Sequence, residues 1–298
     1  MMNIIVTGST GFVGKHLVPL LLEKGFNILE VTRNIEKSLS LYGDKTRKIE
    51  FDDLDINLNK KIIDFRPDVF LHLASYISPS DDYNSIDTLI GSNITYLSKI
   101  LLNLKDSGLK AFVNTGTFAE FKNGDGVLSP AYYYAATKIA SKYIVDYFSN
   151  KDNYKQVYVV PYTIYGGIDT NKKLIDFLFD ALNAHEKVKL TPGNQVLDFV
   201  HVEDVAECYL KVIQNINTIK NGSTIEIGTG VGTSIKDLAS LIENISGKKL
   251  NVEWGGKEYR PNDVMLAIAD VENLVDEIKW KAVIGLKEGI IKSYQKYL

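Results

Sequence analysis

The sequence contains few of the residues that build disulfide frameworks or metal clusters, and it has no long apolar run. Cys208 is the single cysteine in 298 residues, so no internal disulfide can form. The four histidines match no metal-ligand spacing, and we expect no metal site. No apolar run approaches the roughly 18 residues that a membrane span requires, and no secretory leader is recognisable at the start. We therefore expect a cytoplasmic protein without a membrane partner.

The charge balance excludes a second class of partner. Thirty-four basic and 37 acidic residues give a net charge of −3, so the chain has no basic excess with which to bind nucleic acid. Hydrophobic residues make up 45% and charged residues 24%, as in ordinary globular proteins. The length allows one large or two small domains, each with a substantial core.

Short β-prone runs alternate with segments of helical periodicity through the first half of the chain. The expected strands are Asn3–Val6, Phe26–Thr32, Lys48–Phe51, Val69–Leu73, Ala111–Asn114 and Gln156–Val160. The expected helices there are Lys15–Lys24, Ser85–Ser107 and Tyr132–Tyr147. This alternation predicts an α/β fold with a doubly wound parallel sheet, the Rossmann arrangement.

The pattern loosens after about Tyr165, which suggests a division into two parts. We expect residues 1–165 to form the dinucleotide-binding domain and residues 166–298 to form mainly a smaller substrate-binding lobe. Roughly residues 195–230, with a helix at Val202–Ile213 and a strand at Thr224–Ile227, are expected to return to the first domain.

A glycine-rich turn lies between the first strand and the first helix. Gly8 permits a tight turn, Gly11 lets the backbone approach a diphosphate, and Gly14 lets the helix pack closely on the strand. A diphosphate would rest on backbone amides at the start of that helix. The predicted cofactor contacts in this segment are Gly8, Ser9, Thr10, Gly11, Phe12, Val13 and Gly14.

The end of the second strand indicates which dinucleotide is bound. An acidic residue there would hold the ribose 2′-hydroxyl of NAD, but Thr32 occupies that place and Arg33 follows. A guanidinium suits a 2′-phosphate, so NADP is preferred and NAD stays possible. After the third strand, Asp53 and Leu54 are placed to contact adenine.

Tyr134 and Lys138 form a Tyr-x-x-x-Lys motif in a predicted helix. Residues four apart share a helix face, so the phenol and the ammonium can serve one site. A fixed cation stabilises the phenolate and is expected to make Tyr134 an acid or base near neutral pH. Thr115 follows the fifth strand at the carboxyl edge of the sheet, where ligands bind in such folds.

With these residues in order, the chain resembles the extended short-chain dehydrogenases, a family of nucleotide-sugar epimerases, dehydratases and reductases. The resemblance spans nearly the whole chain. Besides the glycine turn and the Tyr134/Lys138 pair, it rests on Pro67–Val69, Leu71–Ala74, Asn93, Thr115–Thr117, Ile164–Gly166, Asp198–Ala206 and Arg260–Asp263.

The resemblance implies a role for each matched residue. Tyr134 exchanges a proton with the sugar oxygen, Lys138 holds the nicotinamide ribose, and Thr115 hydrogen-bonds the reacting oxygen. Further implied cofactor contacts are Leu73, Ala74, Asn93 and Pro161. The implied contacts to a nucleotide-sugar substrate are Thr115, Thr117, Thr163, Lys173, Leu174 and Arg260, the last a planar cation suited to a diphosphate. The helices expected at Ser85–Ser107 and Tyr132–Tyr147 match those that form a homodimer interface in this family.

Departures from the family pattern narrow the reaction. Dehydratases follow the threonine with Asp-Glu, whereas Gly116 and Thr117 stand here, which argues against dehydration. One remaining reaction is NADPH-dependent reduction of a nucleotide-linked 4-keto-6-deoxy sugar, as in CDP-, dTDP- or GDP-deoxysugar synthesis for surface polysaccharides. The other is 4-epimerisation with a retained NAD. Arg33 favours the reductase, and the chain looks most like synthases of CDP- or dTDP-linked deoxysugars. A non-catalytic NADP-binding sensor or assembly subunit is a third reading, which the intact Tyr134, Lys138 and Thr115 disfavour.

Overall fold

The computed structural model describes residues 2–51, 57–78, 80, 82–167, 172–272 and 278–295. The described strands are β1 (Asn3–Thr7), β2 (Asn27–Thr32), β3 (Arg47–Glu50), β4 (Val69–His72), β5 (Ala111–Thr115), β6 (Lys155–Pro161), β7 (Thr163–Tyr165), β8 (Val188–Leu190), β9 (Val196–His201), β10 (Thr224–Ile227), β11 (Gly232–Ser234), β12 (Val252–Trp254) and β13 (Leu266–Ala267). The described α-helices are α1 (Phe12–Glu23), α2 (Ile35–Tyr42), α3 (Leu58–Phe65), α4 (Tyr83–Ile90), α5 (Tyr96–Leu102), α6 (Tyr133–Asp152), α7 (Leu174–Ala181), α8 (Val202–Gln214), α9 (Ile235–Ser246) and α11 (Leu286–Tyr294).

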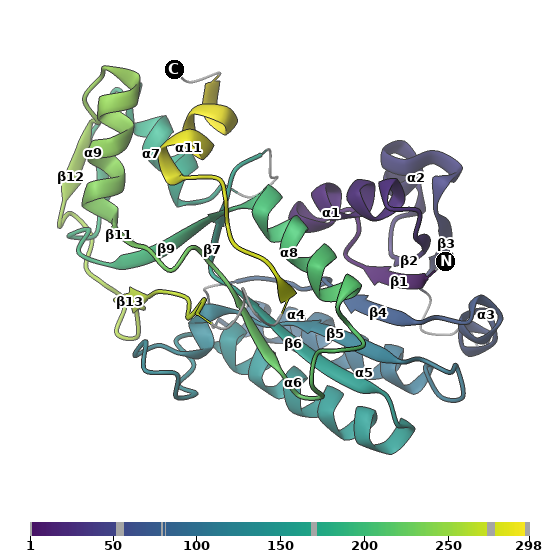
Figure 1. Ribbon diagram of the computed structural model, residues 1–298. Coiled ribbons are helices and arrows are strands. Elements are labelled where there is room, and N and C mark those ends of the chain that lie inside the picture. Colours follow the sequence, from purple (N-terminus) through teal and green to yellow (C-terminus); the bar gives the residue numbers. More distant parts are fainter. Residues whose placement is uncertain are drawn as a thin grey trace.

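A seven-stranded parallel sheet forms the centre of the molecule, in the order β10-β6-β5-β4-β1-β2-β3 (Figure 1). The strand order reverses beside β1, which leaves a crevice at the carboxyl ends of β1 and β4, the usual ligand position in such sheets. The predicted doubly wound fold is confirmed.

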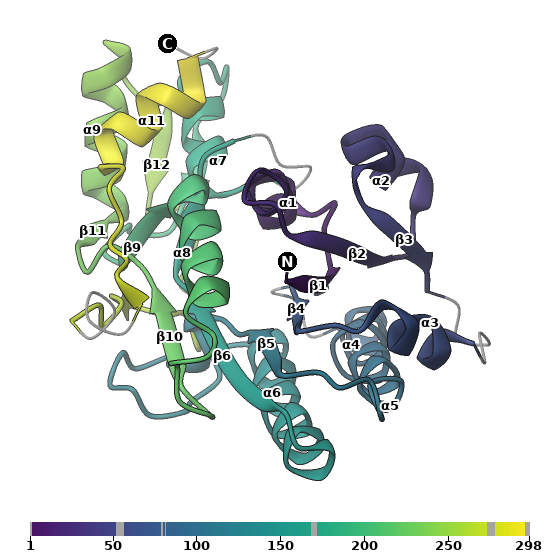
Figure 2. The same cartoon turned by 45° about the vertical axis from the view of Figure 1, so that its right-hand side comes forward.

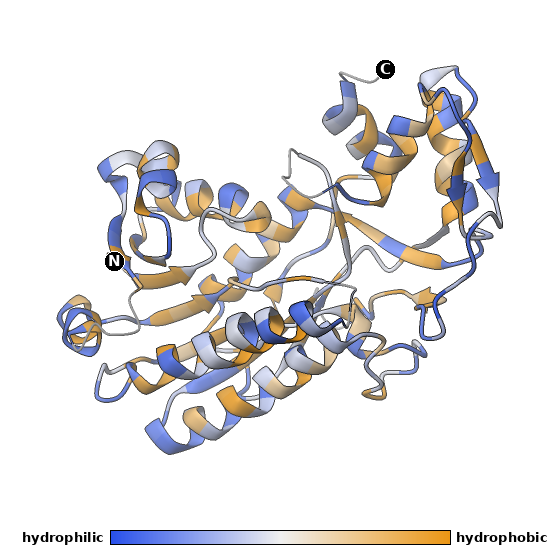
Figure 3. Cartoon of the chain, turned by 180° about the vertical axis from the view of Figure 1, so that it is seen from behind, coloured by the Kyte–Doolittle hydropathy of each residue, from blue (hydrophilic) through white to orange (hydrophobic). Residues whose placement is uncertain are grey.

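The inner strands form where the sequence is apolar without alternation. Ile4, Ile5 and Val6 of β1 have no exposed surface, and Phe70 and Leu71 of β4 are equally buried. Strands covered by helices on both faces need apolar side chains in both directions, so a continuous run is the expected pattern. Figure 3 shows this as largely hydrophobic central strands beneath helices of mixed hydropathy.

Helices cover both faces of the sheet (Figure 2). On one face Leu17 and Leu21 of α1 pack with Tyr209 and Ile213 of α8 in a single buried cluster. On the other face α3, α5 and α6 share a cluster that includes Leu58, Leu101 and Phe148. Helix α8 and strand β10 therefore lie with the central sheet although they follow the first part of the lobe in sequence.

The single helix expected at Ser85–Ser107 is divided. A π-helical turn at Gly91–Thr95 separates α4 from α5. The wider turn contains Asn93, which is 2% exposed and hydrogen-bonds the chain after β4. Such π turns are common at functional sites, and here one adjoins the ligand crevice.

The smaller lobe is built around β9, which pairs with β7, β11 and β13, and around the pair β8–β12. Helices α7, α9 and α11 cover it and share a buried cluster with Tyr158 and Val160 of β6, so the lobe packs directly on the central sheet. Across the ranges given above, no helix is both long and apolar enough to cross a bilayer. The same ranges contain no group of three or more His, Cys, Asp or Glu residues that could hold a metal ion.

Candidate active site

The glycine turn after β1 has no room for side chains. A Cβ at Gly8, whose φ is +71°, would lie 2.6 Å from the backbone nitrogen of Ala74. A Cβ at Gly14 would collide with the backbone oxygens of Gly8 and Ser9. The Tyr42 hydroxyl donates to the Ser9 carbonyl at 2.7 Å and anchors the turn from α2. The turn is thus held rigidly at the start of α1, where backbone amides point outward.

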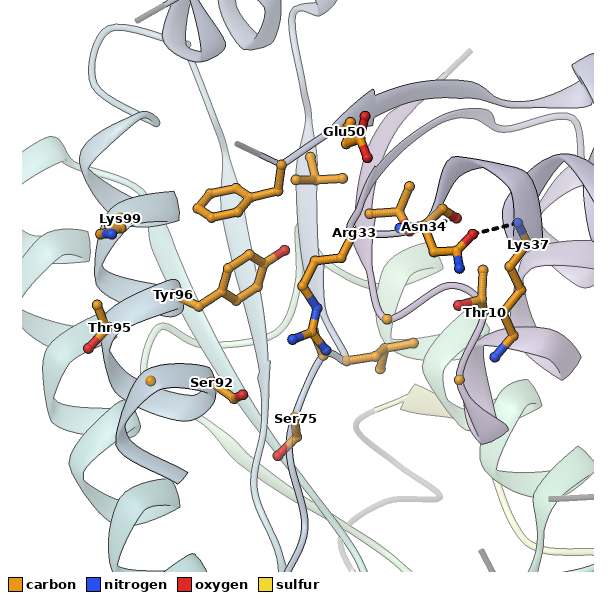
Figure 4. A pocket seen from close by; sticks show the side chains of 18 of the residues that line it. Thr10, Arg33, Asn34, Lys37, Glu50, Ser75, Ser92, Thr95, Tyr96 and Lys99 are labelled. Carbon is orange, nitrogen blue, oxygen red and sulfur yellow. Dashed lines mark hydrogen bonds between the residues drawn. The ribbon is translucent and has the colours of Figure 1, made fainter. Parts of the chain in front are cut away.

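A cavity of about 1030 Å³ opens beside this turn (Figure 4). Of the residues expected to contact a cofactor, six line it: Gly8, Thr10, Gly11, Arg33, Leu73 and Ala74. The other predicted cofactor contacts in the described chain do not line it: Ser9, Phe12, Val13, Gly14, Asn93, Tyr134, Lys138 and Pro161. The predicted adenine contacts Asp53 and Leu54 lie outside the described residues.

The sequence analysis missed much of the cavity wall. The additional lining residues are Val31, Thr32, Asn34, Lys37, Glu50, Phe51, Ser75, Thr88, Gly91, Ser92, Thr95, Tyr96 and Lys99. Lys37 carried a detectable signal, because Asn34 is an N-cap type and places Lys37 in the first turn of α2. The Asn34 side chain accepts from the Lys37 backbone at 2.8 Å.

Two cations, Arg33 and Lys37, line the end of the cavity at β2, together with one carboxylate, Glu50 of β3. Arg33 is exposed and points into the cavity, and its charge acts on Tyr96 across it (Figure 4). Within the described chain the Arg33 guanidinium has no hydrogen-bond or ion-pair partner. The acidic residue of this strand, Glu30, faces the opposite way and has no exposed surface.

Glu30 serves the scaffold and not the ligand. Its carboxylate accepts from Ser9 at 2.5 Å and from Ser38 at 2.7 Å, and also from Thr46. Lys48 lies 3.8 Å from it. A buried carboxylate with this many donors is satisfied in place. It is therefore unavailable to a ribose hydroxyl in the cavity.

Tyr134 and Lys138 lie one turn apart near the start of α6, and both are buried, at 8% and 2% exposure. Burial raises the pKa of Tyr134 to about 12, against a smaller lowering from the adjacent Ser75 hydroxyl. Burial also lowers the pKa of Lys138 to about 8. The expectation that Lys138 brings the Tyr134 pKa toward neutrality is wrong, because burial raises this pKa. Burial outweighs charge here, and the amine loses its proton before the phenol does.

Neighbouring side chains fix the surroundings of this pair. The Thr115 hydroxyl, expected to face a substrate oxygen, shares a 2.8 Å hydrogen bond with the Tyr209 hydroxyl of α8. Asn93 accepts from the Tyr76 backbone at 2.9 Å and donates to Thr137 at 3.0 Å, so it joins the segment after β4 to α6. Asn93 therefore positions Ser75 next to Tyr134, a contact that the sequence analysis did not foresee.

The histidines near the site are structural. Thr7 shares a 2.8 Å hydrogen bond with His72, whose pKa falls to about 3 through burial and the charge of Lys138. His201 caps α8 and contacts the Ser293 hydroxyl at 2.9 Å. Burial raises the pKa of the Cys208 thiol well above its usual range, so Cys208 is an inert core residue.

The residues expected to hold substrate are spread between the two parts of the chain. Thr117 is 8% exposed and caps a short 3₁₀ turn at Phe118–Glu120. The Lys173 ammonium lies 4.3 Å from the Phe12 ring centroid, which links the lobe to the start of α1. Arg260 is exposed, and its backbone nitrogen donates to Asp263.

The two remaining predicted substrate contacts, Leu174 and Thr163, differ in their surroundings. Leu174 begins α7 and packs on the lobe core. The Thr163 hydroxyl is buried and has no hydrogen-bond partner among the residues described. The structure therefore brings Lys173 to the glycine turn, while it engages Thr117 in a turn of its own.

Comparison with known proteins gives consistent matches over the whole chain. The sequence model of the NAD dependent epimerase/dehydratase family matches residues 4–228. CDP-abequose synthase of Salmonella typhimurium is 29% identical over 290 residues, covering 96% of this chain and 95% of the relative. CDP-abequose synthase of Yersinia pseudotuberculosis is 30% identical over 271 residues, with 89% and 91% covered. UDP-glucose 4-epimerase of Mycolicibacterium smegmatis is 24% identical, with 99% and 98% covered.

Solved structures share the fold. A point mutant of UDP-glucuronic acid 4-epimerase from Bacillus cereus, in complex with UDP-4-deoxy-4-fluoro-glucuronic acid and NAD, superposes with a TM-score of 0.88 at 21% identity. The match covers 99% of both chains. UDP-glucose 4-epimerase from Thermotoga maritima gives a TM-score of 0.85 at 22% identity, covering 99% of this chain and 98% of its own.

Proposed function

The chain belongs to the NAD-dependent epimerase/dehydratase family and is an NAD(P)-dependent nucleotide-sugar enzyme, and from that premise we propose its reaction. The reaction is NADPH-dependent reduction of the 4-keto group of a nucleotide-linked 4-keto-6-deoxy sugar. The similarity to two CDP-abequose synthases at 29% and 30% identity supports a deoxysugar product and favours a cytidine nucleotide over dTDP or GDP.

The residues present fit a nicotinamide dinucleotide. The glycine turn presents backbone amides at the start of α1, and a Cβ at Gly8 would collide with the backbone of Leu73 and Ala74, so only glycine allows this turn. Arg33 and Lys37 suit a 2′-phosphate at the ribose end of the cavity. The Lys138 ammonium has no hydrogen-bond partner within the described part of the chain and is available to ribose hydroxyls. When bound, the cofactor supplies the hydride for ketone reduction.

The observation that carries the proposal is the burial of Tyr134 beside Lys138. With its pKa raised to about 12, the Tyr134 phenol keeps its proton at neutral pH. A protonated phenol can donate to a carbonyl oxygen as that oxygen gains negative charge. A charged Lys138 then stabilises the phenolate that remains. Thr115 supplies a second hydroxyl at the carboxyl edge of β5 for the same oxygen.

A 4-epimerase is the second candidate, favoured by the matches to UDP-glucose 4-epimerases. Epimerisation begins by removing a proton from a sugar hydroxyl, and Tyr134 must then start as the phenolate. The buried, protonated phenol suits the reductive direction better. The cations at β2 also favour a cofactor that exchanges between its oxidised and reduced forms in solution.

The test is a panel of nucleotide-linked 4-keto-6-deoxy sugars with NADPH, read by loss of NADPH absorbance and by NMR of the product. We expect oxidation of NADPH with a CDP- or dTDP-linked ketone. In Tyr134→Phe turnover should fall by roughly a hundredfold or more, the contribution of a general acid, while NADPH affinity is retained. Interconversion of sugars without net oxidation would favour the epimerase. Binding of NADPH without turnover of any sugar would favour a sensor or assembly subunit.

A further inference from the structure

A buried carboxylate lies behind the catalytic pair. Glu120 ends the 3₁₀ turn that follows β5, and it has no exposed surface. Its Oε1 accepts from the Thr117 backbone nitrogen at 2.8 Å and from the Tyr158 hydroxyl at 2.7 Å. Its Oε2 is also buried and has no hydrogen-bond partner within the described residues. One oxygen therefore holds the turn in place, and the other is left without a donor. Burial raises the pKa of Glu120, while its hydrogen bonds and the charge of Lys138 lower it, so the carboxylate depends on a nearby cation to stay ionised.

The groups that face this carboxylate come from two elements. Tyr134, Lys138 and Lys142 of α6 interact with it electrostatically, and Tyr158 of β6 bonds it directly. Lys142 is engaged elsewhere, because its ammonium lies 4.8 Å from the Tyr158 ring centroid and bonds Thr224 at 3.3 Å. The buried cation left for Glu120 to compensate is Lys138.

Lys138 needs such compensation. Its side chain is 2% exposed, and burial lowers its pKa, while Glu120 acts in the opposite direction. His72, the other basic group acting on the pair, is neutral near pH 7, since its pKa lies at about 3. Without a nearby negative charge a buried amine tends to release its proton, and its field on the phenol is then lost.

We propose that Glu120 is a positioning residue whose buried carboxylate keeps Lys138 in the charged form beside the cofactor ribose and Tyr134. The proposal rests on the function proposed above. Glu120 does not line the cavity, and its bonded oxygen is fixed by Thr117 and Tyr158. It therefore acts through Lys138 and does not replace the acid and base that dehydratases carry after their threonine.

The decisive variant is Glu120→Gln, because the amide oxygen can still accept from Thr117 and Tyr158 while the charge is removed. Glu120 raises the pKa of both Lys138 and Tyr134, so its neutralisation lowers both. The alkaline limb of kcat/KM for ketone reduction should move to lower pH by on the order of one unit. Near pH 8 that corresponds to about a fivefold loss, approaching tenfold at higher pH, whereas the loss at pH 6 should be small.

A second readout needs no sugar. The affinity for NADPH is measured by NADPH fluorescence between pH 7 and pH 9.5 in buffers of one ionic strength. As the pH rises, this affinity should begin to fall at a lower pH in Glu120→Gln than in the wild type. Glu120→Asp keeps the charge and should keep the wild-type pH profile, with a lower rate if the shorter side chain loosens the turn. Tyr158→Phe removes a hydrogen bond and leaves the charge, so it should not lower the alkaline limb.

The outcomes separate the two proposals. If no nucleotide sugar is reduced by the wild type, the proposed function fails, and the NADPH-binding profile still decides the role of Glu120. If Glu120→Gln leaves both profiles unchanged, or if Tyr158→Phe shifts them equally, Glu120 is structural only. If Glu120→Gln does not fold, a wild-type profile in Glu120→Asp with no shift in Tyr158→Phe supports the charge. A shift in both of those variants overturns it.

Discussion

The two cations at the ribose end of the cavity predict a measurable preference for NADPH. Replacing Arg33 with alanine removes a planar donor that no other described side chain engages. Hydrogen bonds to charged groups contribute about 1.5 to 3 kcal/mol, and Arg33 is exposed, so the lower end applies. Since about 1.4 kcal/mol is a factor of ten, NADPH affinity should fall about tenfold while NADH affinity changes little.

Lys37 should contribute less than Arg33. Its ammonium is a strongly hydrated point charge without the guanidinium fork, so we expect a loss of roughly fivefold in Lys37→Ala. If both cations bind the same 2′-phosphate, as proposed, the double variant should lose less than the product of the single effects. Both effects should shrink at high salt, because the screening length falls from about 10 Å at 0.1 M to about 3 Å at 1 M.

The assay is the ratio of dissociation constants for NADPH and NADH, measured by fluorescence at two salt concentrations. Lys45→Ala is a matched control, because Lys45 is an exposed cation close in sequence to α2 that does not line the cavity. An unchanged ratio in the double variant would show that the 2′-phosphate is held elsewhere. An equal loss for both cofactors would show that the cations hold the diphosphate or adenine instead.

Three further outcomes test the site and the assembly. Reduction should slow above about pH 8 as Lys138 loses its proton, with no limb near pH 6.5 from His72, measured as a pH–rate profile. Gly14→Ala should weaken cofactor binding at least tenfold and lower Tm, because rigid backbone oxygens occupy the Cβ position. Tyr143 and Tyr147 of α6, 61% and 64% exposed, are predicted to lie in a homodimer interface, so sedimentation should show a dimer that a double Tyr→Glu variant dissociates.

Much of the fold could be predicted because its signal is local. The inner strands of the central sheet are mostly apolar runs, and each strand predicted for this sheet falls within a residue or two of its observed bounds. Short strands such as β7 and β13 carry no such signal. They exist because segments distant in sequence pair with one another, for example Leu266 with Val196.

The sequence predicted which residues form the candidate site better than it predicted their pKa values. The spacing of Tyr134 and Lys138 gives their proximity, but it says nothing of the solvent excluded around them, and so the expected direction of the Tyr134 pKa was wrong. Glu120 had a signal that went unused. Thr117-x-x-Glu120 is a capping-box pattern, and the structure contains both of its hydrogen bonds.

The protonation state of Tyr134 separates the two candidate reactions on energetic grounds. An epimerase must first ionise the phenol, and burial, which raises its pKa to about 12, opposes that ionisation unless other groups stabilise the phenolate. A reductase begins with the phenol protonated and needs Lys138 only as the proton leaves. The reductive start therefore needs no such stabilisation before the proton is transferred. The cations Arg33 and Lys37, which line the cavity at the end of β2, favour the same direction through a different physical effect, the attraction of a 2′-phosphate.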